Sequence, residues 1–429
     1  MSQASQEPID TEKVEVSQAV QPQPAPSSPI PNGGFKAWLQ VLGAHLLFFN
    51  SWGIVNTFGA YQAYYETDLL KSKSASEISW IGTFQGFLLI VFGIISGPFF
   101  DQGHHRALLI VGTFLVVFGM MMTSLATEYW QLFLAQGLVV GLGTGCLFLP
   151  SVAIVATYFS TKRALATGIT AAGGSVGSVI YPIVFRKLQP KIGFPWATRV
   201  IAFIGLGTLT ISILVMRTRV PHPKKSRSLV DMSAFGSGQF ILFSIGLFLA
   251  FMGLYIPFFY IIVYAQNKIH LDGNLSFYLL SVLNGASVFG RILPGLLADK
   301  FGSLNVLISC SLGAAIVGYC WLAVHNLVGI VVFCIFYGFL SGAVVSLPST
   351  VVASLVPELR LMGTWMGMCF CFAGLGFLIG NPIAGAIINI KTNDFTGGLV
   401  FAATTVIAGS AAFIGVRILK MKTLQGFKV

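Results

Sequence analysis

The chain has 429 residues, of which 55% are hydrophobic and only 9% are charged. A soluble domain carries about 25% charged residues, so this composition excludes a water-facing globular fold. The net charge of +11 would indicate nucleic-acid binding in a soluble protein, but here the basic residues stand in short stretches between apolar runs. That placement indicates membrane topology instead, and no nucleic-acid partner is expected.

Residues 1–34 are polar and rich in Gln, Ser and Pro, which predicts a disordered cytosolic tail. We expect no cleavable signal peptide before the first apolar run, so that run should direct insertion. Apolar segments of about 20 residues follow, the length that crosses a hydrocarbon core of about 30 Å. Spanning helices are predicted near 37–60, 77–99, 107–126, 130–157, 164–186, 196–216, 239–264, 275–297, 304–323, 327–352, 361–388 and 397–418.

These segments predict an all-α integral membrane protein of twelve transmembrane helices in two six-helix bundles. The bundles are expected at 35–216 and 238–418, with a cytosolic central loop at 217–237 and a cytosolic tail at 419–429. With both termini inside, the cytosolic segments hold 16 Lys and Arg residues and the external segments hold 8. This bias favours an orientation with both termini in the cytosol. The plasma membrane is the expected location, with an organelle membrane left open.

An internal repeat relates the two halves. The segment Gly97-Pro-Phe-Phe-Asp101 is echoed by Gly295-Leu-Leu-Ala-Asp299, which lies 198 positions later. Pro150-Ser151 recurs as Pro348-Ser349 at the same offset. Two parallel six-helix halves resemble the major facilitator architecture, which implies a solute site between the halves.

The two G-x-x-x-D loops are expected to face the cytosol. Their carboxylates can cap the next helix, where free N–H groups favour negative charge. Nearby basic side chains offer pairs that break and re-form as the halves rock, so gating and simple capping both stay open. The predicted gating residues are Asp101, Arg106, Asp299, Lys300, Arg163 and Arg360.

Three further motifs resemble one family in particular. Asn32–Trp38 is similar to the motif that precedes helix 1 of the monocarboxylate transporter family. Tyr158–Gly168, continued by Gly173–Gly177, is similar to that family's helix 5 motif, and Gly290–Asp299 resembles its helix 8 signature, especially in fungal members. The resemblance implies a carrier of small organic anions or related metabolites, often coupled to protons. Fungal members also carry vitamins and secondary metabolites.

Several positions depart from the family pattern. Animal members have a helix 1 lysine implicated in proton and anion binding where this chain has Asn56, and a helix 8 aspartate where it has Ser287. Asn32 and Lys36 also differ from the motif before helix 1. The usual proton-coupling groups are therefore partly missing, which leaves the substrate and the coupling open.

Polar residues within the predicted spans are candidates for a solute site, because ionisable groups there are costly. Arg291 is the one cation predicted at depth, where its planar guanidinium suits a carboxylate or acts as a structural tether. All acidic residues are expected in tails, loops or helix ends. Helix 1 presents His45, Trp52 and Asn56 on one face, with His45 either a proton path or a packing residue. The predicted substrate-binding set is Arg291, Asn56, His45, Tyr260, Tyr264 and Asn381.

The sequence thus predicts a secondary active transporter that moves a monocarboxylate or similar small organic anion by alternating access, with proton symport left open. The alternative is a facilitator or exporter of a neutral or secondary metabolite without proton coupling. We expect no enzyme, because the chain lacks a compact acid/base or metal constellation such as H-E-x-x-H. No cofactor and no metal are expected, and the partners are a small-molecule substrate, the bilayer and, in the symport case, protons. A monomer is expected.

Overall fold

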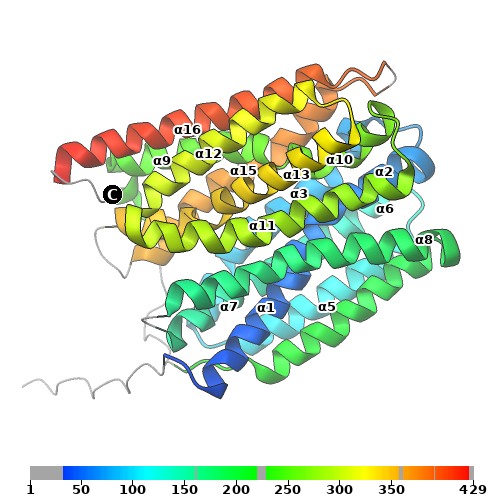
Figure 1. Ribbon diagram of the computed structural model, residues 1–429. Coiled ribbons are helices and arrows are strands. Elements are labelled where there is room, and N and C mark those ends of the chain that lie inside the picture. Colours follow the sequence, from blue (N-terminus) through cyan, green and yellow to red (C-terminus); the bar gives the residue numbers. More distant parts are fainter. Residues whose placement is uncertain (1–31, 160–161, 220–228, 357–360, 391, 425–429) are drawn as a thin grey trace, which may run out of the picture.

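The computed structural model describes residues 32–159, 162–219, 229–356, 361–390 and 392–424. Within these ranges, long helices lie side by side (Figure 1). The first residues of α1 and the last residues of α16 lie at the same end of the bundle, which we call the terminal face. The opposite end is the distal face. Residues 1–31 of the predicted tail at 1–34, and residues 220–228 of the predicted central loop at 217–237, lie outside the described residues.

The first half contains the helices that lead from the terminal face through the kinked α8. Their bounds are α1 Phe35–Asn56, α2 Phe58–Tyr64, η1 Tyr65–Leu69, α3 Ala75–Ile95, α4 Gly97–Asp101, α5 His105–Thr123, α6 Tyr129–Leu132, η2 Phe133–Val140, α7 Gly141–Tyr158 and α8 Arg163–Val215.

The second half begins after the central loop. Its elements are η3 Met232–Gly236, α9 Gly238–Leu254, α10 Ile256–Asn267, α11 Gly273–Phe301, α12 Ser303–Cys320, η4 Trp321–Ala323, α13 Leu327–Ser346, α14 Pro348–Leu355, α15 Met362–Ile387 and α16 Thr396–Leu424.

The described chain holds 11 helical segments that are long and apolar enough to cross a bilayer. One of them lies within α8, which is too long for a single crossing. As one straight helix, the 53 residues of α8 would extend for about 80 Å. Gly193 breaks it with a φ of 78°, between Pro190 and Pro195. Only glycine adopts this left-handed conformation without strain. The two arms fold back on each other (Figure 1), so α8 supplies two crossings and the predicted twelve are confirmed.

The sequence repeat is also a structural repeat. Helix 1 breaks at Thr57, between α1 and α2, and helix 7 breaks at Tyr255, between α9 and α10, which is 198 residues later. Both G-x-x-x-D segments end at a glycine with positive φ, Gly103 at 93° and Gly302 at 89°. The equivalent turns let the following helix reverse direction in each half.

Helix 1 is longer than its hydropathy predicts. Instead of ending near residue 60, it continues through α2 and the π-helical turn η1 to Leu69. Tyr61 and Tyr65 are fully buried there. The polar and aromatic residues of this extension therefore pack inside the protein, which a lipid-based hydropathy signal does not register.

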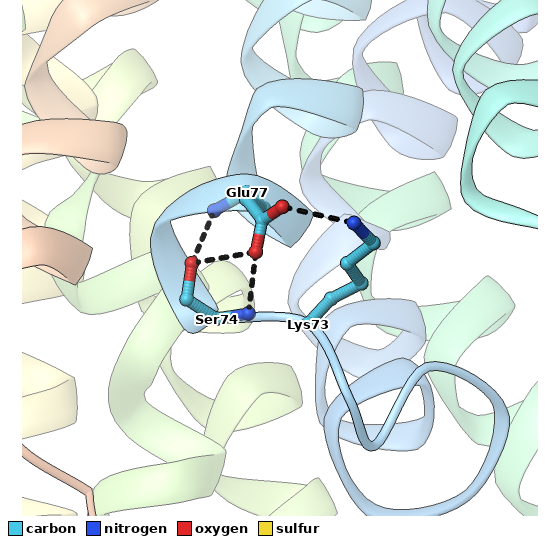
Figure 2. Close-up of polar contacts among 3 residues, drawn as sticks. All are labelled: Lys73, Ser74 and Glu77. Carbon is cyan, nitrogen blue, oxygen red and sulfur yellow. Dashed lines mark hydrogen bonds and ion pairs between the residues drawn. The ribbon is translucent and has the colours of Figure 1, made fainter.

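A capping box fixes the start of α3 at the distal face (Figure 2). The Oγ of Ser74 accepts a hydrogen bond from the backbone N–H of Glu77 at 3.2 Å, and the Glu77 carboxylate accepts one from the backbone N–H of Ser74 at 2.9 Å. Lys73 Nζ lies 3.1 Å from the same carboxylate. The two backbone bonds satisfy free helix-end donors, and such a cap stabilises a helix by about 1 kcal/mol.

The two halves meet mainly along three helix pairs. α3 packs on α15 along its length. At the distal end, Ser76 Oγ donates to the carbonyl of Pro382 at 2.8 Å, and at the terminal end Gly367 faces Ile94. The first arm of α8 packs on α11. At the distal face, α2 packs on α10, with the rings of Phe58 and Phe259 5.2 Å apart. The contact between α2 and α10 closes the centre of the interface toward the distal face.

Candidate functional site

Arg291 lies at the interface between the halves. The side chain projects from α11 of the second half, is only 6% exposed, and donates from one terminal guanidinium nitrogen to the carbonyl of Ala171 on α8 at 3.0 Å. Its Nε is buried and has no hydrogen-bond partner among the described residues. A buried donor without a partner costs about 1–3 kcal/mol, and more when it is charged. The guanidinium is therefore a strong site for an acceptor on a solute.

Small residues of α8 allow this approach. Ser175 and Ser287, one turn from the Ala171–Arg291 contact, bond through their hydroxyls at 2.8 Å. A Cβ atom built on Gly174 would lie 2.8 Å from the Cβ of Trp52 and 3.4 Å from a guanidinium nitrogen of Arg291. Gly174 thus occupies the space between the two side chains. Figure 1 shows the first arm of α8 between α11 and α1.

Aromatic rings continue the site across the interface. The ring of Trp52 on α1 stacks on that of Tyr255, with the ring centroids 6.1 Å apart and an angle of 18° between the ring planes. Tyr255 stands at the break between α9 and α10, and it contacts Phe377 of α15 edge-on at 4.7 Å. The ring of Phe148 on α7 contacts that of Trp52 edge-on, with the ring centroids 6.2 Å apart. These rings present flat apolar surfaces from both halves, which suit a planar or aromatic solute.

Buried amides without complete hydrogen bonding occur on four helices that form the interface. Both side-chain amide atoms of Asn56 and of Gln85 lack a partner, and so do the Oδ1 atoms of Asn284 and Asn381. All four side chains are at most 2% exposed. Buried polar groups are normally bonded to protein or water, so these four are candidates to contact a polar solute or the water that accompanies it.

The predicted site residues fall into two groups. Arg291, Asn56 and Asn381 belong to helices at the interface, and the Tyr260 hydroxyl donates to the Asn381 carbonyl at 3.1 Å. Tyr264 instead packs within the second half, where its hydroxyl donates to the carbonyl of Val324 at 2.8 Å. His45 is half-buried between α1 and α8, with its Nδ1 2.8 Å from the carbonyl of Ile169. A substrate-binding role for Tyr264 and His45 stays a prediction.

The gating predictions are only partly within reach of the structure. Arg106, in the first turn of α5, and Lys300, in the last turn of α11, are exposed. The side chains of Asp101, Asp299 and Arg163 and the whole of Arg360 lie outside the described part of the chain. Their pairing stays a prediction.

Sequence comparison identifies the family. The profile of the Major Facilitator Superfamily matches residues 41–361. The chain belongs to the major facilitator superfamily. It is therefore a membrane transporter and not an enzyme, as its sequence predicts.

This major facilitator protein is similar to fungal transporters over most of its length. It is 44% identical to the MFS-type transporter dbaD of Emericella nidulans, over 90% of this chain and 87% of that protein. The aspyridones efflux protein apdF of the same organism is 38% identical, over 93% and 82% of the two chains. The agnestins efflux protein AgnL12 of Paecilomyces divaricatus is 39% identical, over 90% and 88%. The names of these relatives do not mention monocarboxylates, so that finer resemblance remains a hypothesis.

Several residues of the major facilitator interface were not predicted from the sequence. Tyr255, Gln85, Asn284 and Phe377 were missed, although the sequence does carry one signal. Tyr255 precedes Pro257, and a proline just inside a new helical segment marks the break that turns this ring toward the first half. The other three lie within apolar runs that look the same whether they face lipid or the partner half.

Proposed function

We propose that this carrier exports a secondary metabolite that combines a planar or aromatic ring with an anionic or carbonyl group. The observation that carries the proposal is the pairing of Arg291 with the Trp52–Tyr255 stack at the interface between the halves. The guanidinium offers charge-assisted hydrogen bonds to an oxygen, and the rings offer stacking surface. Unpaired amides of Asn56 and Gln85 add polar contacts.

Similarity to named exporters supports the direction of transport. Two relatives carry names for the efflux of aspyridones and of agnestins, and each matches more than four fifths of both chains. This similarity favours the exporter alternative over uptake of a monocarboxylate. In the proposed arrangement the terminal face is cytosolic and the membrane is the plasma membrane, so the solute leaves toward the distal face.

Alternating access follows from the two related halves. Solute from the cytosol would bind beside Arg291 while the α2–α10 contact keeps the distal face closed. Rocking of the halves would then separate α2 from α10 and open the site to the other side. The broken helices at Thr57 and Tyr255 supply the flexible points near the site.

A second candidate function is transport of a small monocarboxylate. Arg291 favours it, because a guanidinium can hold a carboxylate bidentately. The residues that stand at the family's proton-coupling positions do not supply charge: Asn56 is an amide, and the Ser287 hydroxyl is bonded to Ser175. The aromatic surface also exceeds what a molecule of lactate size needs.

The test is flux in proteoliposomes with three solute classes: aromatic carboxylates or phenols, neutral aromatic ketones, and lactate-sized monocarboxylates. Arg291→Ala is compared with Arg199→Ala, since Arg199 bonds Ser124 inside the first half at 3.0 Å and not at the interface. We expect aromatic anions to move, with flux at least about tenfold lower in Arg291→Ala, because a charge-assisted hydrogen bond contributes about 1.5–3 kcal/mol. Flux of lactate-sized anions alone would support the second candidate, and equal flux in the two variants would remove Arg291 from the site.

A further inference from the structure

A carboxylate lies where the halves touch at the distal face. Glu66, in η1, is partly buried, and its Oε1 accepts a hydrogen bond from Nε2 of Gln62 at 2.8 Å. Gln62 is fully buried one turn earlier, and its own Oε1 has no partner. Among the described residues, no cation lies at ion-pairing distance from Glu66. The carboxylate therefore depends on one neutral donor.

The groups that face Glu66 come from both halves. Tyr260 of α10 lies near the Glu66 carboxylate and near the side chains of Gln62 and Ser79. The Tyr260 hydroxyl is bonded to the Asn381 carbonyl of α15. Polar contacts thus lead from η1 across the interface to α10 and α15. Tyr260 is the titratable group that these helices present to Glu66, while α3 presents Ser79.

A neighbouring acid provides a contrast. Asp68, two residues later in η1, is exposed, accepts a hydrogen bond from the Thr67 hydroxyl at 2.8 Å, and lines a cavity of about 140 Å³ at the distal face. Two acids of the same helical turn therefore have different surroundings. Asp68 is exposed, whereas Glu66 is partly buried beside the amide of Gln62.

We propose that Glu66 is a proton-binding site that controls opening of the distal face, an inference that rests on the proposed export function. Enclosure between the halves favours the neutral acid, since a carboxylate loses its hydration there. The neutral acid can donate to the unpaired oxygen of Gln62 once that amide rotates, whereas the carboxylate can only accept. Protonation stabilises the closed contact between α2 and α10, and loss of the proton to the distal water stabilises the open state.

The proton is taken up from and returned to water at the distal face, so the device needs no net proton transport. By linkage, the state that binds more protons is favoured at lower pH. Acid on the distal side thus holds the exit closed, and alkaline conditions favour its opening. This sets the rate of export without changing the chemistry of the substrate site.

The test measures opening without any substrate. Spin labels are placed at Lys71 and Lys268, which are exposed on opposite halves at the distal face, in a background with the exposed Cys320 replaced by Ser. Distances are measured by double electron–electron resonance in nanodiscs between pH 5 and pH 9. In the protein with Glu66 intact, the ratio of long to short distances should rise about tenfold as the pH increases from 5 to 9. Asp68→Asn should give the same rise. Glu66→Gln should keep the short distance at every pH.

A second variant keeps the test decisive if Glu66→Gln folds poorly. Gln62→Leu removes the amide that donates to the carboxylate, so the charged form is less favoured and the midpoint of the distance change should move to higher pH. A Glu66→Gln protein that opens with pH like the parent, or a parent that shows no pH dependence, overturns the proposal. Because no substrate is present, failure of the export function would appear in the flux experiment and leave this result unaffected.

Discussion

Replacing Gly174 by Ala should disturb the site through a single methyl group. The new Cβ would lie 2.8 Å from the Cβ of Trp52, well inside the separation of about 3.5–4 Å at which carbon atoms attract. Both atoms are fixed to their backbones, so α1 and α8 must move apart. Overpacking of this kind costs about 1–3 kcal/mol.

Gly207 of the same helix supplies a matched control, because nothing lies within 4 Å of a Cβ built there. Gly207→Ala should gain about 0.5–1 kcal/mol from reduced backbone entropy in the unfolded chain. Gly174→Ala gains the same entropy term, so the two variants should differ by the overpacking cost of about 1–3 kcal/mol.

The assay is thermal unfolding in detergent at one scan rate, followed by solute binding. Gly174→Ala should unfold at a lower temperature than Gly207→Ala, and it should bind the solute more weakly because Trp52 and Arg291 both shift. Equal unfolding temperatures would refute the close packing of α1 on α8 from which the site is built.

Three further predictions concern the cap of α3, the Asp231 carboxyl and the pair of hydroxyls between α8 and α11. Ser74→Ala should lower the unfolding temperature and speed amide exchange in the first turn of α3, since losing such a cap costs about 1 kcal/mol. The Trp365 Nε1–H donates to Asp231 at 2.8 Å and, with Ser233, lowers the pKa of that carboxyl. A carboxyl whose pKa is lowered in the folded protein stabilises the fold above the ordinary aspartate pKa of about 3.9. This stabilisation is lost as the pH falls through the lowered pKa. Asp231→Asn should therefore unfold at a lower temperature than the parent at pH 7 but not near pH 3. In a double-mutant cycle, Ser175→Ala and Ser287→Ala should show a coupling energy of about 1 kcal/mol, and independent effects would contradict their 2.8 Å bond.

The crossings and the repeat could be predicted from the sequence because each depends on a strong local signal. Runs of apolar residues mark the number and order of the crossings, and the offset of 198 positions carries over to the helix breaks at Thr57 and Tyr255. Arg291 was also predictable, because a cation inside an apolar run has few explanations.

The rest of the interface depends on which apolar face meets the partner half. Phe377 and Gln85 lie in runs where hydropathy alone does not distinguish lipid from protein contact. Glu66 was expected in a loop, because apolar character fades near residue 60 although the helix continues to Leu69. The buried side chains of Tyr61 and Tyr65 explain that continuation, since tertiary packing and not lipid stabilises this turn.

The central claim is that solute binds between the halves at Arg291 and Trp52. Equilibrium binding of a transported aromatic anion to the purified protein tests it most directly, with Arg291→Ala, Trp52→Ala and Arg199→Ala compared under the same conditions. The dissociation constant should rise at least about tenfold for the first two variants and stay unchanged for the third. Unchanged affinity in Arg291→Ala and Trp52→Ala would place the solute elsewhere in the bundle and contradict the account.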